Sequence, residues 1–135
     1  MLKPITNSEL LARLIFCPRF CDNELKRFNN RFIFLRENEE GISCCRFSLM
    51  TKAQIDNRGK LLANKNVYKG YALAVVNEII AIDETVIYIT ATSNDHAEIR
   101  FKINGETMHG NVRSSQLQYY FDEIKELFLK NIVTV

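Results

Sequence analysis

The chain has 135 residues, of which 47% are hydrophobic and 25% are charged, and its formal net charge is +2. This length suits one domain over 1–135 with a single core, and the nearly balanced, interspersed charges disfavour DNA as a partner. No apolar run approaches the roughly 20 residues that span a bilayer, and Glu9 and Arg13 interrupt the N-terminal apolar stretch, so we expect a cytoplasmic protein with neither a signal peptide nor a membrane partner.

Residues 7–16 predict a helix that Asn7 or Ser8 caps and that Pro18 ends. Four apolar residues share one face at helical spacing: Leu10, Leu11, Leu14 and Ile15. The same stretch is also compatible with extended chain, so the sequence leaves both conformations open.

The next part of the chain predicts two strands and a weak helix. Residues 32–35 and 42–47 are typical of strands, and the acidic loop 36–41 joins them. Residues 51–62 predict a helix whose apolar positions form no clean stripe, and 64–70 predict a polar loop.

The central region predicts the core of a sheet. Residues 71–80 form a near-continuous apolar run that suits a strand buried on both faces, and 85–90 predict a second strand. In 97–103 apolar and charged residues alternate, as expected of a strand with one face in water. Asn104-Gly105 signals a turn, after which 106–108 begin a short return strand.

The C-terminal region predicts an amphipathic helix from about Ser115 to Lys130. Its apolar stripe consists of Leu117, Tyr120, Phe121, Ile124, Leu127 and Phe128. Ser115 and Gln118 have the spacing of a capping box. The predicted fold is therefore α+β, a mainly antiparallel sheet covered by this C-terminal helix.

Four cysteines are present: Cys17, Cys21, Cys44 and Cys45. An even count indicates disulfides mainly in short secreted chains, so we expect reduced, partly buried thiols. Cys44 and Cys45 are adjacent in a predicted strand and should point to opposite faces, which disfavours a zinc site built from all four. We expect no metal and no cofactor.

His96 is the first candidate for acid or base chemistry, because histidine titrates near neutral pH. It stands where a polar turn enters the alternating strand, and Glu98 on the same face can orient its ring. The alternative is that His96 closes the turn through a backbone hydrogen bond. His109, in the loop before the final helix, is either a ligand-binding residue that folds back toward His96 or an exposed loop residue.

Arg13, Arg46 and Arg100 are candidate ligand-binding residues. Guanidinium groups gathered in one cleft would bind phosphate or carboxylate through paired hydrogen bonds. The alternative is a solvated strand face. No glycine-rich phosphate loop and no common catalytic motif accompanies these arginines in the sequence.

Three short segments follow one another in a recognisable order. They are an Arg-x-Ile-x-x-Pro-like start at 13–18, an Ile-Ser-x strand at 42–44 followed by a helix that begins near Thr51, and a His-Ala-x-Ile strand at 96–99. In this order they resemble a group of small uncharacterised bacterial proteins. The resemblance implies that Arg13 lies in an extended segment and that His96 marks a site to test, and it implies no function.

The leading hypothesis is a small binding component of a bacterial multi-protein system, which docks a protein partner and has no chemistry of its own. The alternative is a compact enzyme or toxin directed at a nucleotide or RNA, with His96 as acid or base and arginines holding phosphate. The alternative requires His96, Arg46 and Arg100 to converge within about 8 Å in one pocket. An exposed edge strand would also permit a homodimer.

Overall fold

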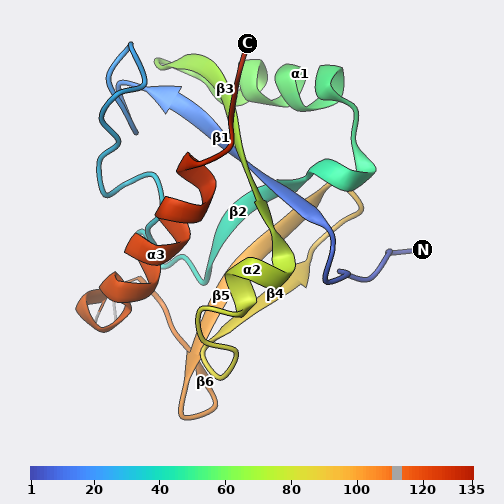
Figure 1. Ribbon diagram of the computed structural model, residues 1–135, viewed down its shortest axis with the longest axis vertical. Helices are drawn as coiled ribbons and strands as arrows, with labels where there is room; N and C mark the ends of the chain where they lie inside the picture. Colours follow the sequence, from blue (N-terminus) through green and yellow to red (C-terminus); the bar gives the residue numbers. More distant parts are fainter. Residues whose placement is uncertain (111–113) are drawn as a thin grey trace.

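The computed structural model describes residues 1–110 and 114–135, and within them seven strands form one antiparallel sheet (Figure 1). Across the sheet the order is β4-β5-β2-β1-β3-β7, and β6 pairs with β5. The strands are β1 (Leu10–Cys17), β2 (Gly41–Arg46), β3 (Val67–Val75), β4 (Ile87–Ala91), β5 (His96–Ile103), β6 (Glu106–Thr107) and β7 (Ile132–Thr134). The helices are α1 (Lys52–Leu62), α2 (Val76–Ile80) and α3 (Gln118–Leu129). The predicted α+β class is confirmed.

β1 is a central strand, so the helix predicted over 7–16 is wrong and the extended alternative is right. It pairs along its whole length with β3, from Leu10 opposite Val75 to Cys17 opposite Val67. Six of its eight residues are buried. The sequence of a strand buried on both faces is a continuous apolar run, and the sequence of a short buried helix can look the same. Here the pairing with β3 makes the segment a strand.

β3 runs from Val67 to Val75, so the loop predicted over 64–70 is wrong from Val67 onward and the strand predicted over 71–80 is right for its first half only. The reason is that its partner begins at Leu10, opposite Val75. One residue further on, the N–H of Val76 donates to the carbonyl oxygen of Glu9. The chain then turns into α2.

The strands predicted over 85–90, 97–103 and 106–108 are confirmed as β4, β5 and β6. β4 and β5 pair antiparallel, and β5 alternates between buried apolar residues and partly exposed charged ones. Asn104 and Gly105 have φ angles of 53° and 81°, as the tight turn into β6 requires.

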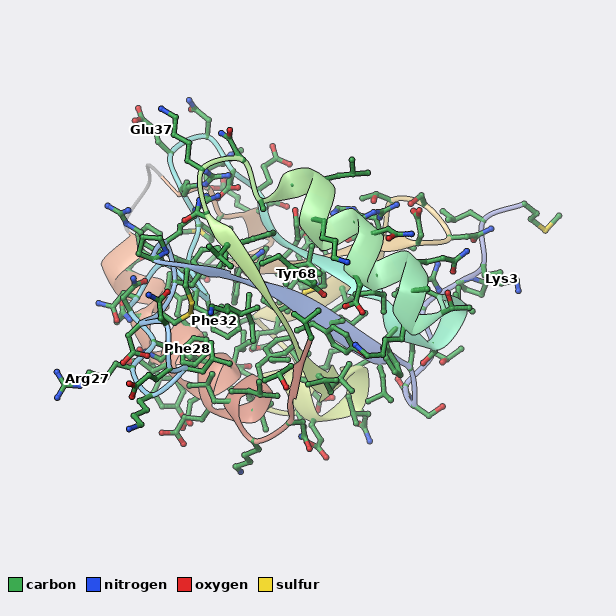
Figure 2. The ribbon with its side chains drawn as sticks, turned by 90° about the horizontal axis from the view of Figure 1, so that it is seen from above. Lys3, Arg27, Phe28, Phe32, Glu37 and Tyr68 are labelled. Carbon is green, nitrogen blue, oxygen red and sulfur yellow. A yellow bond between two sulfur atoms is a disulfide. The ribbon has the colours of Figure 1, made fainter. Side chains whose placement is uncertain are left out.

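α3 and α1 lie on opposite sides of the sheet, red and green in Figure 2. α3 buries one apolar stripe, made of Phe121, Ile124 and Phe128. It begins at Gln118, after a 3₁₀ turn over Ser114–Leu117, and the predicted cap on the Ser115 side chain lies outside the described residues. Among the described helices, none is both long and apolar enough to cross a membrane.

α1 begins with a capping box, which stabilises the weak helix predicted over 51–62. The hydroxyl of Thr51 accepts from the N–H of Gln54, and the Gln54 side chain accepts from the N–H of Thr51. The helix approaches β3 so closely that a Cβ atom on Gly59 would lie 2.2 Å from the ring of Tyr68. Gly59 therefore permits the packing of α1.

Residues 18–40, which we call the long loop, connect β1 to β2 without a strand beyond one isolated bridge. The strand predicted over 32–35 is therefore wrong. Its apolar residues are buried nonetheless, because they pack toward α3; the ring of Phe32 lies 6.5 Å from that of Phe128. Loops of this length without secondary structure are uncommon and are often functional.

Cys17 and Cys21 form a disulfide, so the expectation of reduced thiols is wrong for this pair. The chain reverses in a turn directly after β1, which brings the two Cα atoms to 5.1 Å, within the range that a disulfide requires. Cys44 and Cys45 are free and buried.

Candidate functional site: an arginine-lined cleft

β1 and β2 pair over a short length and then diverge (Figure 1). Their register contains two residue pairs, Leu11 with Arg46 and Ala12 with Cys45, whereas β1 pairs with β3 throughout. A cleft of about 790 Å³ lies between the diverging strands and the long loop. Its volume falls in the range of small-ligand sites, roughly 300–1,000 Å³.

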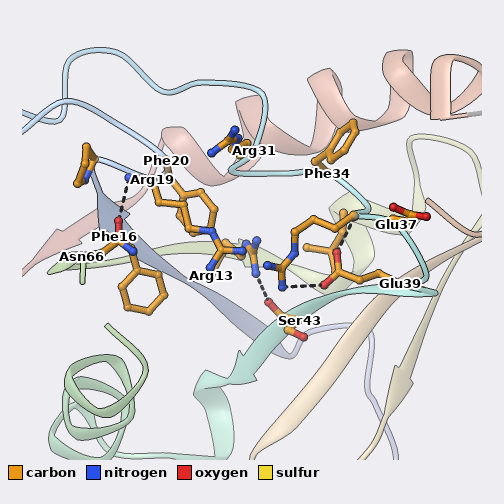
Figure 3. Close-up of a pocket in the computed structure, with 13 residues that line it drawn as sticks. Arg13, Phe16, Arg19, Phe20, Arg31, Phe34, Glu37, Glu39, Ser43 and Asn66 are labelled. Atoms are coloured by element: carbon orange, nitrogen blue, oxygen red, sulfur yellow. Dashed lines mark hydrogen bonds and ion pairs between the residues drawn. The ribbon is translucent and has the colours of Figure 1, made fainter. Parts of the chain in front are cut away.

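Six of the 13 residues that line this cleft, which we call the arginine cleft, are charged (Figure 3). Four arginines line it: Arg13 from β1, and Arg19, Arg31 and Arg36 from the long loop. Two glutamates, Glu37 and Glu39, also line it. Four positive against two negative charges leave an excess of two, which equals the net charge of the whole chain.

Arg13 lies where the pairing between β1 and β2 ends. Its Nε donates to the carbonyl oxygen of Phe32 and its Nη1 to that of Ser43, both at 2.9 Å. The guanidinium therefore bridges the long loop and β2 where strand hydrogen bonds are missing. Burial lowers the pKa of Arg13, and the nearby charges of Arg19 and Arg36 also lower it.

Arg19 lies in the turn that the disulfide closes. Its guanidinium and that of Arg13 both lie over the ring of Phe20, each 5.1 Å from the ring centre. Burial lowers the pKa of Arg19, and the charges of Arg36 and Arg31 contribute to the same shift. The fold thus holds like charges close together.

Acidic neighbours compensate the arginines only in part. Arg36 forms an ion pair with Glu39, with 3.2 Å between Nη2 and Oε2. Among the described residues, no carboxylate lies within ion-pair distance of Arg13, Arg19 or Arg31. Arg13 uses two of its five N–H groups on backbone carbonyl oxygens, so each of the three guanidinium groups keeps N–H groups without a described acceptor.

The aromatic residues of the arginine cleft are packed against other side chains. Phe20 lies under the two guanidinium groups, and its ring centre is 6.0 Å from that of Phe16. Phe34 packs edge-on against Phe121 of α3, with 5.6 Å between ring centres. The cleft therefore presents charged groups beside apolar side chains that are already packed.

His96 lies in a smaller cavity of about 170 Å³ between α1 and the sheet, which adjoins the arginine cleft and shares Arg13, Phe16 and Ser43 with it. Its Nδ1 is in hydrogen-bond contact with the hydroxyl of Thr92, and its carbonyl oxygen accepts from the N–H of Thr92 at 3.0 Å. His96 therefore closes the turn between β4 and β5. Burial lowers the pKa of His96, and the charge of Glu98 opposes this shift.

Arg46 is completely buried and has no N–H left for a ligand. It forms a two-point ion pair with Glu9 and donates to the carbonyl oxygens of Lys3, Pro4 and Ser93. All five N–H groups of the guanidinium are thereby used. The structure gives Arg46 a role in holding the N-terminal segment, and it does not support the predicted ligand-binding role.

Arg100, Glu98 and His109 come together around Glu40. Arg100 Nη2 lies 2.7 Å from Glu98 Oε1, and Arg100 Nη1 lies 3.8 Å from Glu40 Oε2. His109 Nδ1 lies 3.7 Å from Glu40 Oε1. Glu98 therefore pairs with Arg100, and the expected contact between His109 and His96 is not among the described contacts.

The convergence that the enzyme hypothesis requires is not formed. Arg46 is buried beside Glu9, and neither Arg46 nor Arg100 is among the described residues that line the His96 cavity. His96 and Arg100 are four residues apart on one strand, a separation of about 13 Å. Of the predicted site residues, only Arg13 lies in the arginine cleft.

The free cysteines are not poised for nucleophilic chemistry. Burial raises the pKa of Cys44 to about 12, and burial also raises the pKa of Cys45. A thiol with a raised pKa holds little thiolate at neutral pH.

Sequence reasoning missed Arg19, Arg31 and Arg36, although the long loop contains a signal for two of them. Three Arg-Phe pairs occur in it, at 19–20, 27–28 and 31–32. The phenylalanines face the core, where Phe20 and Phe32 are buried, while the arginines are more exposed. Buried phenylalanines that alternate with exposed arginines predict that the loop has a basic outer surface. The pattern does not predict which part of the sheet the arginines lie beside.

Comparisons with protein families, with curated proteins and with solved structures find no match to this chain.

Proposed function

We propose that this protein is a binding domain without chemistry of its own, which docks an acidic segment of a protein partner in the arginine cleft. The observation that carries the proposal is the placement of Arg13, Arg19 and Arg31 around one cleft without a described carboxylate partner. Holding like charges together opposes folding, so a role in binding an anion explains the arrangement better than stability does. Arginine binds carboxylates through two parallel hydrogen bonds.

Three features favour an acidic protein segment over RNA. Proteins that bind single-stranded nucleic acid offer free aromatic faces on which bases stack, whereas the ring of Phe20 is covered by Arg13 and Arg19. The 18 basic residues of the chain are nearly balanced by 16 acidic ones, so the chain carries no large positive excess for a polyanion. His96, the expected acid or base, lines the adjoining cavity and is not among the residues that line the arginine cleft.

Two further expectations belong to the proposal. A cytoplasmic location stays a prediction, and so does a homodimer. β4 and β7 stand at the two ends of the strand order, and β4, the longer of the two, is the edge that we expect a second copy to meet.

The proposal is tested by measuring the fluorescence anisotropy of a labelled oligo-glutamate peptide against increasing protein concentration. Arg31→Glu should weaken binding about tenfold or more, the equivalent of one lost charge-assisted hydrogen bond. Lys60→Glu makes the same charge change on the exposed surface of α1, away from the cleft, and should leave the affinity nearly unchanged. The peptide affinity should also fall as salt is raised.

A labelled oligo-uridine of matched charge is measured in parallel. Tighter binding of the RNA, with the same loss in Arg31→Glu, would overturn the choice of an acidic protein and favour the nucleotide-directed alternative. If Arg31→Glu and Lys60→Glu weaken peptide binding equally, the arginine cleft is not the binding site. If the unmodified protein does not bind the peptide at all, the proposal is also rejected.

A further inference from the structure

We infer that the disulfide between Cys17 and Cys21 makes binding at the arginine cleft dependent on redox state, with the oxidised form binding tightly and the reduced form weakly. The inference rests on the proposed function, because it concerns the same cleft. It adds a regulatory property that the charge of the cleft alone does not imply.

The disulfide encloses three residues, Pro18, Arg19 and Phe20, and all three line the arginine cleft. The covalent link therefore fixes a turn that is itself part of the cleft wall. Figure 3 shows Arg19 and Phe20 beside Arg13. A change in this turn must change the cleft.

The backbone of Arg19 is hydrogen-bonded on both sides, but its side chain has few described contacts. Its N–H donates to Oδ1 of Asn66 at 3.1 Å and its carbonyl oxygen accepts from Nδ2 of Asn29 at 2.8 Å, whereas its guanidinium only lies over the ring of Phe20. Phe20 has its own anchors, since it is buried and its N–H donates to the carbonyl oxygen of Phe16 at 2.8 Å. After reduction we expect Phe20 to stay in the core and Arg19 to become mobile.

Charge repulsion gives the direction of this change. The guanidinium of Arg19 faces the positive charges of Arg31 and Arg36, and Glu39 compensates them in part. The disulfide holds Arg19 in this position against the repulsion. Without it, Arg19 can move toward solvent, and a ligand must then immobilise it again on binding.

The chemical step is a thiol–disulfide exchange with a dithiol. One thiolate of the dithiol attacks a sulfur of the Cys17–Cys21 bond and forms a mixed disulfide, and the second thiolate then releases the protein. The S–S bond of the protein breaks, two cysteine thiols form with two protons, and the dithiol is oxidised to its own disulfide. Both sulfur-bearing residues are buried, so the turn must open before the exchange.

The test compares the oxidised protein with protein reduced by dithiothreitol, using the oligo-glutamate probe. Thiol counting in denaturant should rise from two to four per chain on reduction, because Cys44 and Cys45 are already free. We expect reduction to lower the peptide affinity about fivefold, the effect of having to immobilise one long side chain on binding. The double variant Cys17→Ser/Cys21→Ser should match the reduced protein and should not respond to dithiothreitol.

Cys45→Ala is the matched control, since it removes a free thiol and keeps the disulfide. It should respond to dithiothreitol like the unmodified chain. Circular dichroism of the reduced protein shows whether the fold persists, and a loss of fold on reduction would overturn the local mechanism proposed here. Equal affinities of the oxidised and reduced forms would refute the redox dependence alone, whereas no binding by the oxidised form would refute the proposed function itself.

Discussion

Glu9 and Arg46 form a two-point ion pair in the protein interior, with Nε 2.8 Å from Oε2 and Nη2 2.9 Å from Oε1. Arg46 is completely buried and Glu9 is 4% exposed. The pair joins the segment before β1 to the end of β2. Because the same guanidinium also binds the carbonyl oxygens of Lys3 and Pro4, it fastens the N-terminal segment to the sheet.

Replacing one member of this pair should destabilise the fold strongly. Arg46→Met leaves the Glu9 carboxylate buried without a partner, which costs about 3–5 kcal/mol. Urea denaturation measures the free energy of unfolding. Lys26→Ala, which breaks the exposed pair with Glu24, is the control and should change it by less than about 1 kcal/mol. A change of similar size in both variants would contradict the structural role of Arg46.

Gly59→Ala tests the close packing of α1 on β3. Helix propensity favours alanine by about 1 kcal/mol, so an unconstrained site would become more stable. Here the new Cβ would lie 2.2 Å from the ring of Tyr68, and overpacking of this kind costs about 1–3 kcal/mol. We therefore expect lower stability in thermal and urea unfolding. Asn57→Ala, at an exposed position of the same helix, should be neutral or slightly stabilising, and a similar gain in Gly59→Ala would argue against the contact.

The stability of the protein should fall in mild acid because of His96. Burial holds its pKa in the folded protein below the ordinary value of 6.5, so the unfolded chain binds more protons between the two values. The contribution is fully present above about pH 6.5 and is lost as the pH falls through the folded pKa. Unfolding free energies measured across this window should rise with pH. His96→Gln should flatten the rise and His109→Gln should retain it; the reverse pattern would exclude His96 as the origin.

Removing the disulfide should also lower the free energy of unfolding. For a loop as short as Cys17–Cys21, the chain-entropy estimate is about 2 kcal/mol. The comparison is between oxidised protein, reduced protein and the variant Cys17→Ser/Cys21→Ser, each unfolded by urea. The latter two should agree, and a reduced protein as stable as the oxidised one would show that the turn is held by other contacts.

Local sequence pattern was sufficient for much of the fold. The alternation in β5, the turn at Asn104-Gly105 and the stripe of α3 were all predicted, because each depends on a periodicity or a turn preference visible over a few residues. The errors arose where apolar residues have two ways to be buried. Residues 10–17 pair with β3 and form a strand, whereas 32–35 pack toward α3 and form none.

The candidate site was predictable only in part. Arg13 was identified, but Arg46 and Arg100 were grouped with it although neither lines the arginine cleft. Both lie on strands, and their partners, Glu9 for Arg46 and Glu40 for Arg100, are distant in the sequence. An ion pair of this kind cannot be identified from spacing, because it depends on strand order.

The sequence by itself determined the α+β class, the strands β4 to β6 and the near balance of positive and negative residues. Only the tertiary structure decided which of the arginines lie together. The early divergence of β1 from β2 and the path of the long loop bring Arg13 together with Arg19 and Arg31. The physical reason is that side-chain periodicity is a local property of the chain, whereas a cleft is formed by segments that pack from different parts of it.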